Sequence, residues 1–150
     1  MKLSEALIIR GDLQKRVQQI KMRLISNAKI QEGDKTVENP YDILAELDQT
    51  LASLEEMIKK INLTNSKITD GKKTMTELLA ERDVLTSKIS IKQEFLTAAR
   101  SKIDRYSNKE IKIISSIDVK TEQAELDKLS KELRELDVKI QALNWQSDLI

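Results

Sequence analysis

Two short patterns in the sequence have a spacing that could support chemistry. Ser26 and Lys29 match the Ser-x-x-Lys motif of some acyl-transfer enzymes. Glu77 and Glu81 are four positions apart, so a helix would place both carboxylates on one face, where they could hold a metal ion. The acyl-transfer motif lacks its partner motifs, and helical di-iron sites also need Glu-x-x-His, whereas the chain has no histidine and no cysteine. We therefore predict no catalytic residue, no metal ligand and no cofactor, and we do not expect an enzyme.

The other polar candidates could bind a partner or stabilise a fold. The segment 101–119 differs from the rest of the chain, because its "IKIISSI" is β-branched and nearly uncharged. Asn62, Asn65, Arg82 and Asp83 lie close to apolar helix faces, where such groups either fix helix register or form a polar pocket for a small ligand. The candidate interaction or polar-network residues are Lys29, Gln31, Glu32, Asp34, Asn62, Asn65, Arg82, Asp83, Asp104, Arg105, Tyr106, Lys109 and Glu110.

Composition predicts the elements that position these residues. The chain has 150 residues, with 34% charged and 3% aromatic residues, three glycines and one proline. Such a chain suits one helix-rich domain with few turns. We predict a single helical domain over 1–150, with helices at about 4–28, 40–67, 75–104 and 118–146. Ser4, Asn39 and Asp118 are the expected N-caps.

Apolar residues recur every three or four positions within each predicted helix. In the second helix this stripe is Leu44, Leu47, Leu51, Leu54, Ile58 and Ile61, which places Asn65 at the next position. The third carries one stripe at Leu78, Arg82, Leu85, Ile89, Lys92, Leu96, Ala99 and Ile103, and a second at Val84, Ile91 and Ala98. An apolar face this wide predicts either an elongated antiparallel four-helix bundle, or two coiled-coil hairpins whose remaining apolar faces pair in a homo-oligomer.

In an up-down-up-down chain the first and third connections lie at one end. Each contains a short extended candidate, Lys29–Gln31 in the first and Ile111–Ser115 in the third. We consider two interpretations of this loop end. It closes the core with a small β pairing between the two connections, or it forms a site for a protein or small-molecule partner.

Charge argues against nucleic acid as a partner. The net charge is +1, and it alternates along the chain, with +5 over residues 1–30 and −5 over residues 31–66. Helices of opposite charge side by side would neutralise each other, whereas a nucleic-acid binder presents an uncompensated basic face. The sequence also contains no apolar run long enough for a membrane span or a secretory signal, so we expect a cytoplasmic protein that does not bind membranes.

Six blocks resemble a family of small bacterial helical proteins of unknown function, some of which are named septicolysin. The blocks are "MKLSEALIIRGDLQKR", "NAKIQEGD", "INLTN", "AERDVL", "DRYSNKEIK" and "KELRELDVKIQALNW", and they run in order along the whole chain. The resemblance implies a compact helical protein with no established activity and carries over no functional residue. The name septicolysin implies a cytolysin.

These observations leave two functional hypotheses. The favoured one is a non-enzymatic cytoplasmic helical protein that self-associates through apolar helix faces, with a partner or ligand site at the loop end. The alternative is a membrane-active, cytolysin-like protein that opens to expose amphipathic helices.

Overall fold

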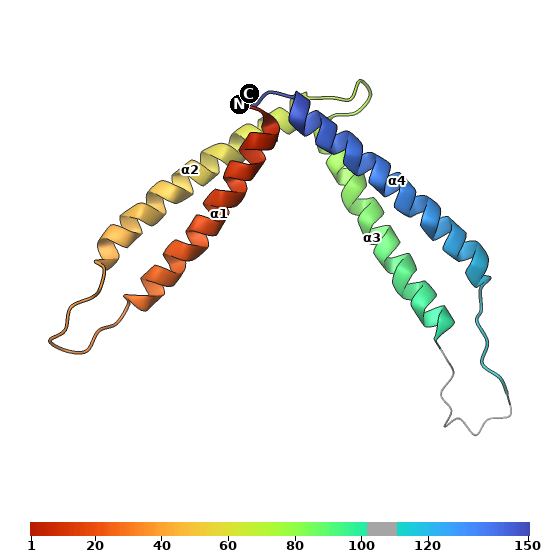
Figure 1. Cartoon of the computed structure of the whole chain (residues 1–150), viewed down its shortest axis with the longest axis horizontal. Helices are drawn as coiled ribbons and strands as arrows, with labels where there is room; N and C mark the ends of the chain where they lie inside the picture. The colour runs from red at the N-terminus through yellow and green to blue at the C-terminus, as the bar shows by residue number, and fades with distance from the viewer. Residues whose placement is uncertain (102–110) are drawn as a thin grey trace. The chain divides into compact units, whose positions relative to one another are not determined.

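The computed structural model describes residues 1–101 and 111–150, which form four α-helices and no β-sheet (Figure 1). The helices are α1 (Leu3–Ser26), α2 (Pro40–Lys67), α3 (Met75–Arg100) and α4 (Val119–Gln146). The predicted all-α class is confirmed, and the predicted helix ranges differ from these by at most two residues except at the end of α3. There the helix ends at Arg100 rather than continuing to residue 104.

The chain divides into two compact units, and each is built on a helical hairpin. The first unit comprises Met1–Met75 and Ala142–Ile150, and the second comprises Thr76–Gln141. In the first unit α1 and α2 lie side by side and antiparallel, and in the second α3 and α4 do the same (Figure 1). The hairpin is therefore the local architecture in both units, and we call the line of side chains through which its two helices meet its seam.

The seam of the first hairpin agrees with the prediction on α2 at Leu47, Leu54 and Ile61 but differs from it at Leu44 and Leu51. Ile43 is 1% exposed, whereas Leu44, the predicted seam residue, is 42% exposed. The seam positions of α2 are all buried or half-buried and have alternating spacings of four and three: Ile43, Leu47, Thr50, Leu54, Met57, Ile61 and Thr64. This heptad spacing keeps one face toward α1. Leu44 and Leu51 belong to a neighbouring, more exposed stripe.

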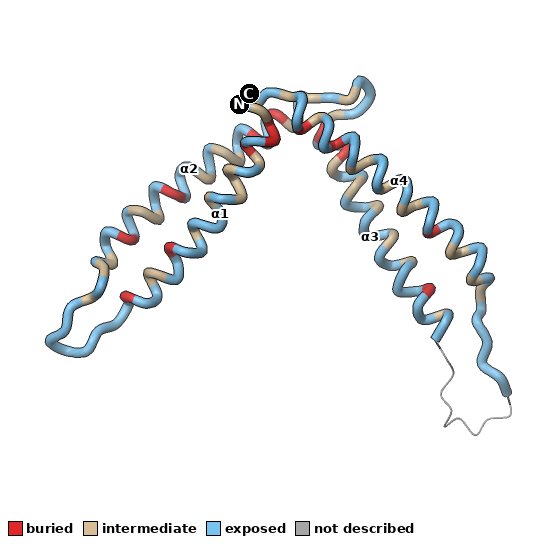
Figure 2. Tube along the Cα trace, viewed as in Figure 1, coloured by how far each residue is buried: buried red, intermediate tan, exposed pale blue. Residues whose placement is uncertain are grey.

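On α1 and in the second hairpin the predicted stripes agree with the burial. Ala6, Ile9, Leu13, Val17, Ile20 and Leu24 are buried or half-buried on α1. The same holds for the predicted seam of α3 from Leu78 to Ala99 and for Leu126, Leu129, Leu133, Leu136, Ile140 and Leu143 on α4. Figure 2 shows the buried positions separated along each helix by half-buried and exposed ones. Each hairpin thus buries one narrow strip per helix.

Two of the three predicted N-caps are present. The Asn39 side-chain oxygen accepts a hydrogen bond from the Tyr41 amide at 3.0 Å, and Asp118 accepts from the Thr121 amide and hydroxyl at 3.4 and 2.8 Å. The prediction for Ser4 is wrong, because the N-cap residue of α1 is Lys2, two residues earlier. Glu5 accepts the Lys2 amide at 2.8 Å, and Ser4 is buried with no hydrogen-bond partner for its hydroxyl within the described chain.

The connections use turn chemistry rather than strands. Between α2 and α3, Gly71 has φ +97°, and Asp70 accepts the amides of Lys72 and Lys73 at 2.9 and 2.8 Å. The predicted β pairing of the first and third connections is not found: in the described residues neither 29–31 nor 111–115 lies in a strand. In the first connection the Glu38 amide instead donates to the side chain of the buried Asn27 at 3.1 Å, which satisfies the backbone without a strand.

Gly11 provides a test of helix energetics in α1. A Cβ at this position would meet no described atom within 4 Å outside its own helical turn, so the glycine serves no close approach of another helix. We expect Gly11→Ala to raise the free energy of unfolding by about 0.5–1 kcal/mol, because alanine loses less backbone entropy on folding. Thermal unfolding followed by circular dichroism measures this change.

Gly33→Ala is the matched control. Gly33 also has open space around it, but its φ is +89°, where an L side chain is strained. We expect this variant to be less stable than the wild type by about 1 kcal/mol. If Gly11→Ala were equally destabilising, the packing around α1 would have to be tighter than described.

Candidate functional site

One surface feature of the second unit is an apolar stripe on the exposed face of α3. We call Ala80, Val84, Ile91, Phe95 and Ala98 the outer stripe of α3. All five are exposed, and the three large ones are 70%, 67% and 49% exposed in chain order. At 3.6 residues per turn they fall within about 60° of one another around the helix axis. The stripe therefore lies along one face of α3 that the hairpin seam does not cover, with Ser87 between Val84 and Ile91 on that face.

An open groove borders the outer stripe between α3 and α4. Its volume is about 620 Å³, and it is lined by Ala80, Glu81, Val84, Leu85, Lys88, Glu132 and Leu136. Its floor is mainly aliphatic, with two carboxylates and one ammonium group among the lining residues. Four of the seven lining side chains are aliphatic and three are charged.

A second feature is an arginine–carboxylate cluster in the first unit. Arg23 binds Glu38 through two hydrogen bonds, from Nε to Oε2 at 3.1 Å and from Nη2 to Oε1 at 2.7 Å. Its Nη1 also donates to Glu46 Oε2 at 2.9 Å, and Arg16 Nη2 donates to Glu46 Oε1 at 3.2 Å. The cluster joins α1 to α2 and to the end of their connection. A bidentate pair fixes geometry as well as contributing charge attraction.

The cluster shifts the pKa values of its members. The hydrogen bond from Arg23 holds the pKa of Glu38 below its ordinary value, and hydrogen bonds from Arg23 and Arg16 do the same for Glu46. Hydrogen bonds to the same two carboxylates raise the pKa of Arg23. All three groups are therefore held in their charged forms, which suits a structural clamp and not proton transfer near neutral pH.

The two ends of the chain are joined within the first unit. Lys2 Nζ lies 2.9 Å from Asp148 Oδ1 and donates to the Gln146 carbonyl at 3.0 Å. Backbone hydrogen bonds run from Leu3 N to the Ser147 carbonyl and from Leu149 N to the Met1 carbonyl. The Ile150 amide donates to the hydroxyl of the fully buried Thr64 at 3.1 Å. These bonds attach the segment after α4 to α1 and α2.

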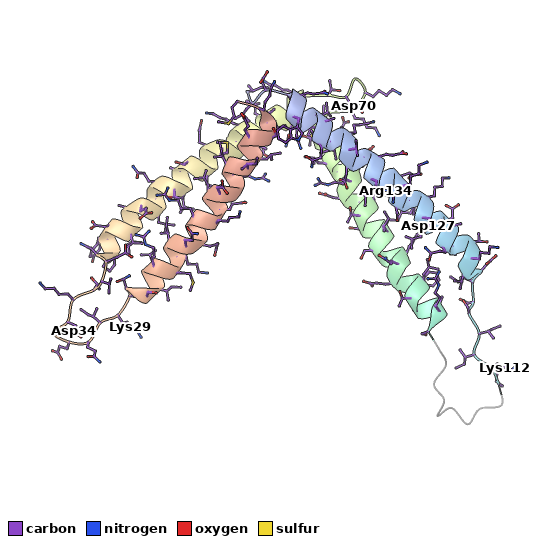
Figure 3. The ribbon with its side chains drawn as sticks, viewed as in Figure 1. Lys29, Asp34, Asp70, Lys112, Asp127 and Arg134 are labelled. Carbon is purple, nitrogen blue, oxygen red and sulfur yellow. The ribbon has the colours of Figure 1, made fainter. Side chains whose placement is uncertain are left out.

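The predicted residues of the first connection lie on an exposed loop. Lys29, Gln31, Glu32 and Asp34 are all exposed, and Figure 3 shows Lys29 and Asp34 beyond the ends of the helices. The Asp34 amide donates to the Gln31 carbonyl at 3.0 Å, so this part of the loop is a tight turn. The described contacts do not bring these four side chains together into one site.

The predicted polar residues of the helices fall into different units. Asn62 is exposed and Asn65 half-buried on α2, because the seam passes through Thr64 instead. The seam position predicted at Asn65 is therefore taken by Thr64, one residue earlier. On α3, Arg82 Nε and Nη2 donate to Asp83 Oδ1 at 3.3 and 3.2 Å, which is a local pair on one helix. Asp104, Arg105, Tyr106, Lys109 and Glu110 lie outside the described residues.

The two patterns with chemical spacing form no catalytic arrangement in the described residues. The Ser26 hydroxyl donates to the Met22 carbonyl at 2.9 Å, a bond within its own helix. Over residues 1–101 and 111–150 no group of three or more acidic side chains is placed to hold a metal ion. Over the same residues no helix has the length and apolar composition to cross a bilayer.

Sequence reasoning missed the arginine–carboxylate cluster and Asn27. A signal was available, since Arg16 and Arg23 are seven residues apart in a basic segment, and Glu38 and Glu46 follow in an acidic one. Heptad-spaced charges beside a seam typically pair across it. The reach of Arg23 to Glu38, outside both helices, could not be read from periodicity because it depends on the path of the connection.

The chain belongs to a family of unknown function. Residues 10–149 match the family model described as "Family of unknown function (DUF6847)". A crystal structure of a functionally unknown conserved protein from Corynebacterium diphtheriae is similar along the full length, with 38% identity, a TM-score of 0.91, and coverage of 100% of this chain and 99% of that one. No curated protein matches the chain. These comparisons support the helical fold and an unknown function, and nothing in them supports the septicolysin name.

The carboxylates of the cluster give a prediction for acid stability. A carboxylate whose folded-state pKa is lowered stabilises the fold above its unfolded-state pKa, and this stabilisation is lost as pH falls through the folded-state value. We expect the unfolding temperature to fall as the pH decreases from 7 toward 3, and Glu38→Gln to reduce this dependence by removing one shifted group.

Glu32→Gln is the control, because Glu32 is exposed on the same connection. It should leave the acid dependence close to that of the wild type. Equal pH profiles for the wild type and Glu38→Gln would contradict the assignment of Glu38 to the cluster. Thermal unfolding at a series of pH values and constant ionic strength provides the measurement.

Proposed function

We propose that the protein is a non-enzymatic helical protein that self-associates through the outer stripe of α3. The observation that carries this proposal is the exposure of Val84, Ile91 and Phe95 on one face of a regular helix. Apolar side chains scattered singly over a surface need no explanation, but several aligned on one helix face beside a groove are typical of an interaction site. Burying such a strip against another apolar surface is favourable by about 25 cal/mol per Å².

The pairing of charged residues in the first unit supports the same proposal. The strongest ion pairs in the first unit join Arg23 to Glu38 and Glu46, and they are satisfied within the chain. Because these side chains already use their charges and hydrogen bonds within the chain, they are less available to bind a substrate. The groove in the second unit is instead mainly aliphatic, and an aliphatic surface recognises another protein by shape and burial. Cytoplasmic location remains a prediction from the sequence.

Val84→Asp tests the proposal. If the outer stripe is a contact surface, placing a carboxylate in it should weaken self-association about tenfold or more, because the charge would be desolvated without a partner. Sedimentation equilibrium over a wide range of protein concentrations measures this. A wild-type protein that stays monomeric at every concentration would refute self-association altogether.

Val138→Asp is a closely matched control. Val138 is 69% exposed and Val84 is 70% exposed, so the two substitutions have the same chemistry at the same exposure. Val138 lies two positions after Leu136 on α4, which puts it on the other side of that helix from the groove. It should leave self-association unchanged. Equal weakening by both variants would point to a general charge effect and against the outer stripe.

We also propose a partner site in the segment before α4. Ile111 and Ile114 are 82% and 81% exposed, and Ile113 is 60% exposed, around Lys112 (Figure 3). Three exposed isoleucines in four residues contribute little to the core of the unit, so a role in contacting another molecule fits them better than closure of the hairpin.

Replacing the three isoleucines with serine separates these two roles. For a partner site we expect the free energy of unfolding to change by no more than about 0.5 kcal/mol per position, as for other surface substitutions. Chemical denaturation measures it. A loss of several kcal/mol would mean that the segment closes the hairpin, and the proposed partner site would then be abandoned.

A further inference from the structure

We infer that the partner of the outer stripe is a second copy of this chain, bound with the two α3 helices antiparallel about a two-fold axis. This inference rests on the proposed self-association and adds the orientation and register. It follows from two properties of α3: the alternation of large and small residues along the stripe, and the position of opposite charges along its edge.

The alternation of sizes favours an antiparallel register. Ser87 is also exposed and lies on the same face, between Val84 and Ile91. With the axis between residues 85 and 86, Ala80 of one chain lies opposite Ile91 of the other, and Val84 lies opposite Ser87. Ile91 and Val84 then each meet a small side chain, Phe95 lies opposite Thr76, and each pair occurs twice by symmetry. In a parallel pairing in register, Ile91 would face Ile91 and Ala80 would face Ala80, which leaves crowded and empty layers.

The charges of the groove favour the same register. Glu81 and Lys88 are seven residues apart, so they lie two turns apart on the same edge of α3, and both line the groove. In the antiparallel register Glu81 of each chain lies two residues, about 3 Å along the axis, from the position opposite Lys88 of the other, so the two can form an ion pair beside the interaction that Glu81 has within its own chain. A parallel pairing would place Glu81 beside Glu81 and Lys88 beside Lys88. Like charges in contact are unfavourable, so the parallel arrangement is disfavoured a second time.

The groove allows a second helix to contact α4 as well as α3, so the contact surface is larger than that of two helices alone. Leu85 of α3 and Leu136 of α4 are half-buried and line it, so a helix lying on the outer stripe also contacts α4. The second units of two chains would then form a four-helix arrangement from two hairpins. Such an arrangement buries the second stripe of α3 that a single hairpin leaves exposed.

Engineered cysteines test the orientation directly, since the chain has no cysteine of its own. We would prepare Ala80→Cys and Ile91→Cys as separate variants of different mass, mix them reduced, and oxidise them slowly. The antiparallel register predicts that the mixed disulfide between residues 80 and 91 is the main product. Main products joining 80 to 80 and 91 to 91 would overturn it in favour of a parallel pairing. Val138→Cys should give no specific product.

Charge exchange provides an independent test. Lys88→Glu alone and Glu81→Lys alone should each weaken association about tenfold, and the double variant should restore it, because the exchanged charges again face each other across the axis. Failure of the double variant to recover would overturn the register. If sedimentation shows a wild-type dimer but the mixed disulfide does not form, the register fails while self-association stands. A monomeric wild type would defeat both.

Discussion

A hairpin of two helices has one seam, and this limits how much apolar surface each of its helices can bury. The seam of the first unit takes the stripe of α2 from Ile43 to Thr64, and that of the second takes the stripe of α3 from Leu78 to Ala99. Both helices carry a further stripe, at Leu44 and Leu51 on α2 and at Val84 and Ile91 on α3. The second stripe must stay in water or be covered by something else, and the surface chemistry of the protein follows from that.

Narrow seams also explain why polar contacts are found at the two ends of the first unit. Burial of a narrow strip contributes only modestly against the entropy of ordering two long helices. At the loop end, Arg23 and Asn27 join α1 to the connection and to α2. At the other end, Lys2 Nζ pairs with Asp148 and the Thr64 hydroxyl accepts a hydrogen bond from the Ile150 amide, which holds the segment that follows α4. Contacts at both ends restrain sliding and fraying, which a uniform aliphatic seam alone does not prevent.

Much of this arrangement could be predicted from the sequence, and what could not be predicted has a physical reason. Helices, caps at Asn39 and Asp118, and the seam of α3 follow from local periodicity and backbone chemistry. On α2 the predicted stripe included Leu44 and Leu51 where the seam takes Ile43 and Thr50, because both sets lie three or four residues from Leu47 and Leu54. Only the position of α1 decides between two such stripes. The strand pairing failed because β-branched residues in a loop predict extended backbone but not a partner.

The residues of the candidate site also depend on tertiary packing that local sequence patterns do not reveal. Exposed loop residues such as Lys29 and Asp34 were singled out by composition, but the structure gives them no common arrangement. The second stripe on α3 could be recognised in the sequence. Its exposure, and the groove beside it that Leu136 helps to line, depend on how α4 packs.

The difference between the two seams indicates why the second unit is the one that would gain from a partner. On α3 the seam includes Arg82 and Lys92, both half-buried, and Lys92 lies 3.7 Å from Glu122 across the hairpin. Charged groups at seam positions reduce the apolar area buried there, and part of what they gain in ion pairing is offset by desolvation. The outer stripe lies on the same helix, on a different face from these residues. Covering it would add the apolar burial that the seam of α3 lacks, so self-association and stability of this hairpin are expected to be coupled.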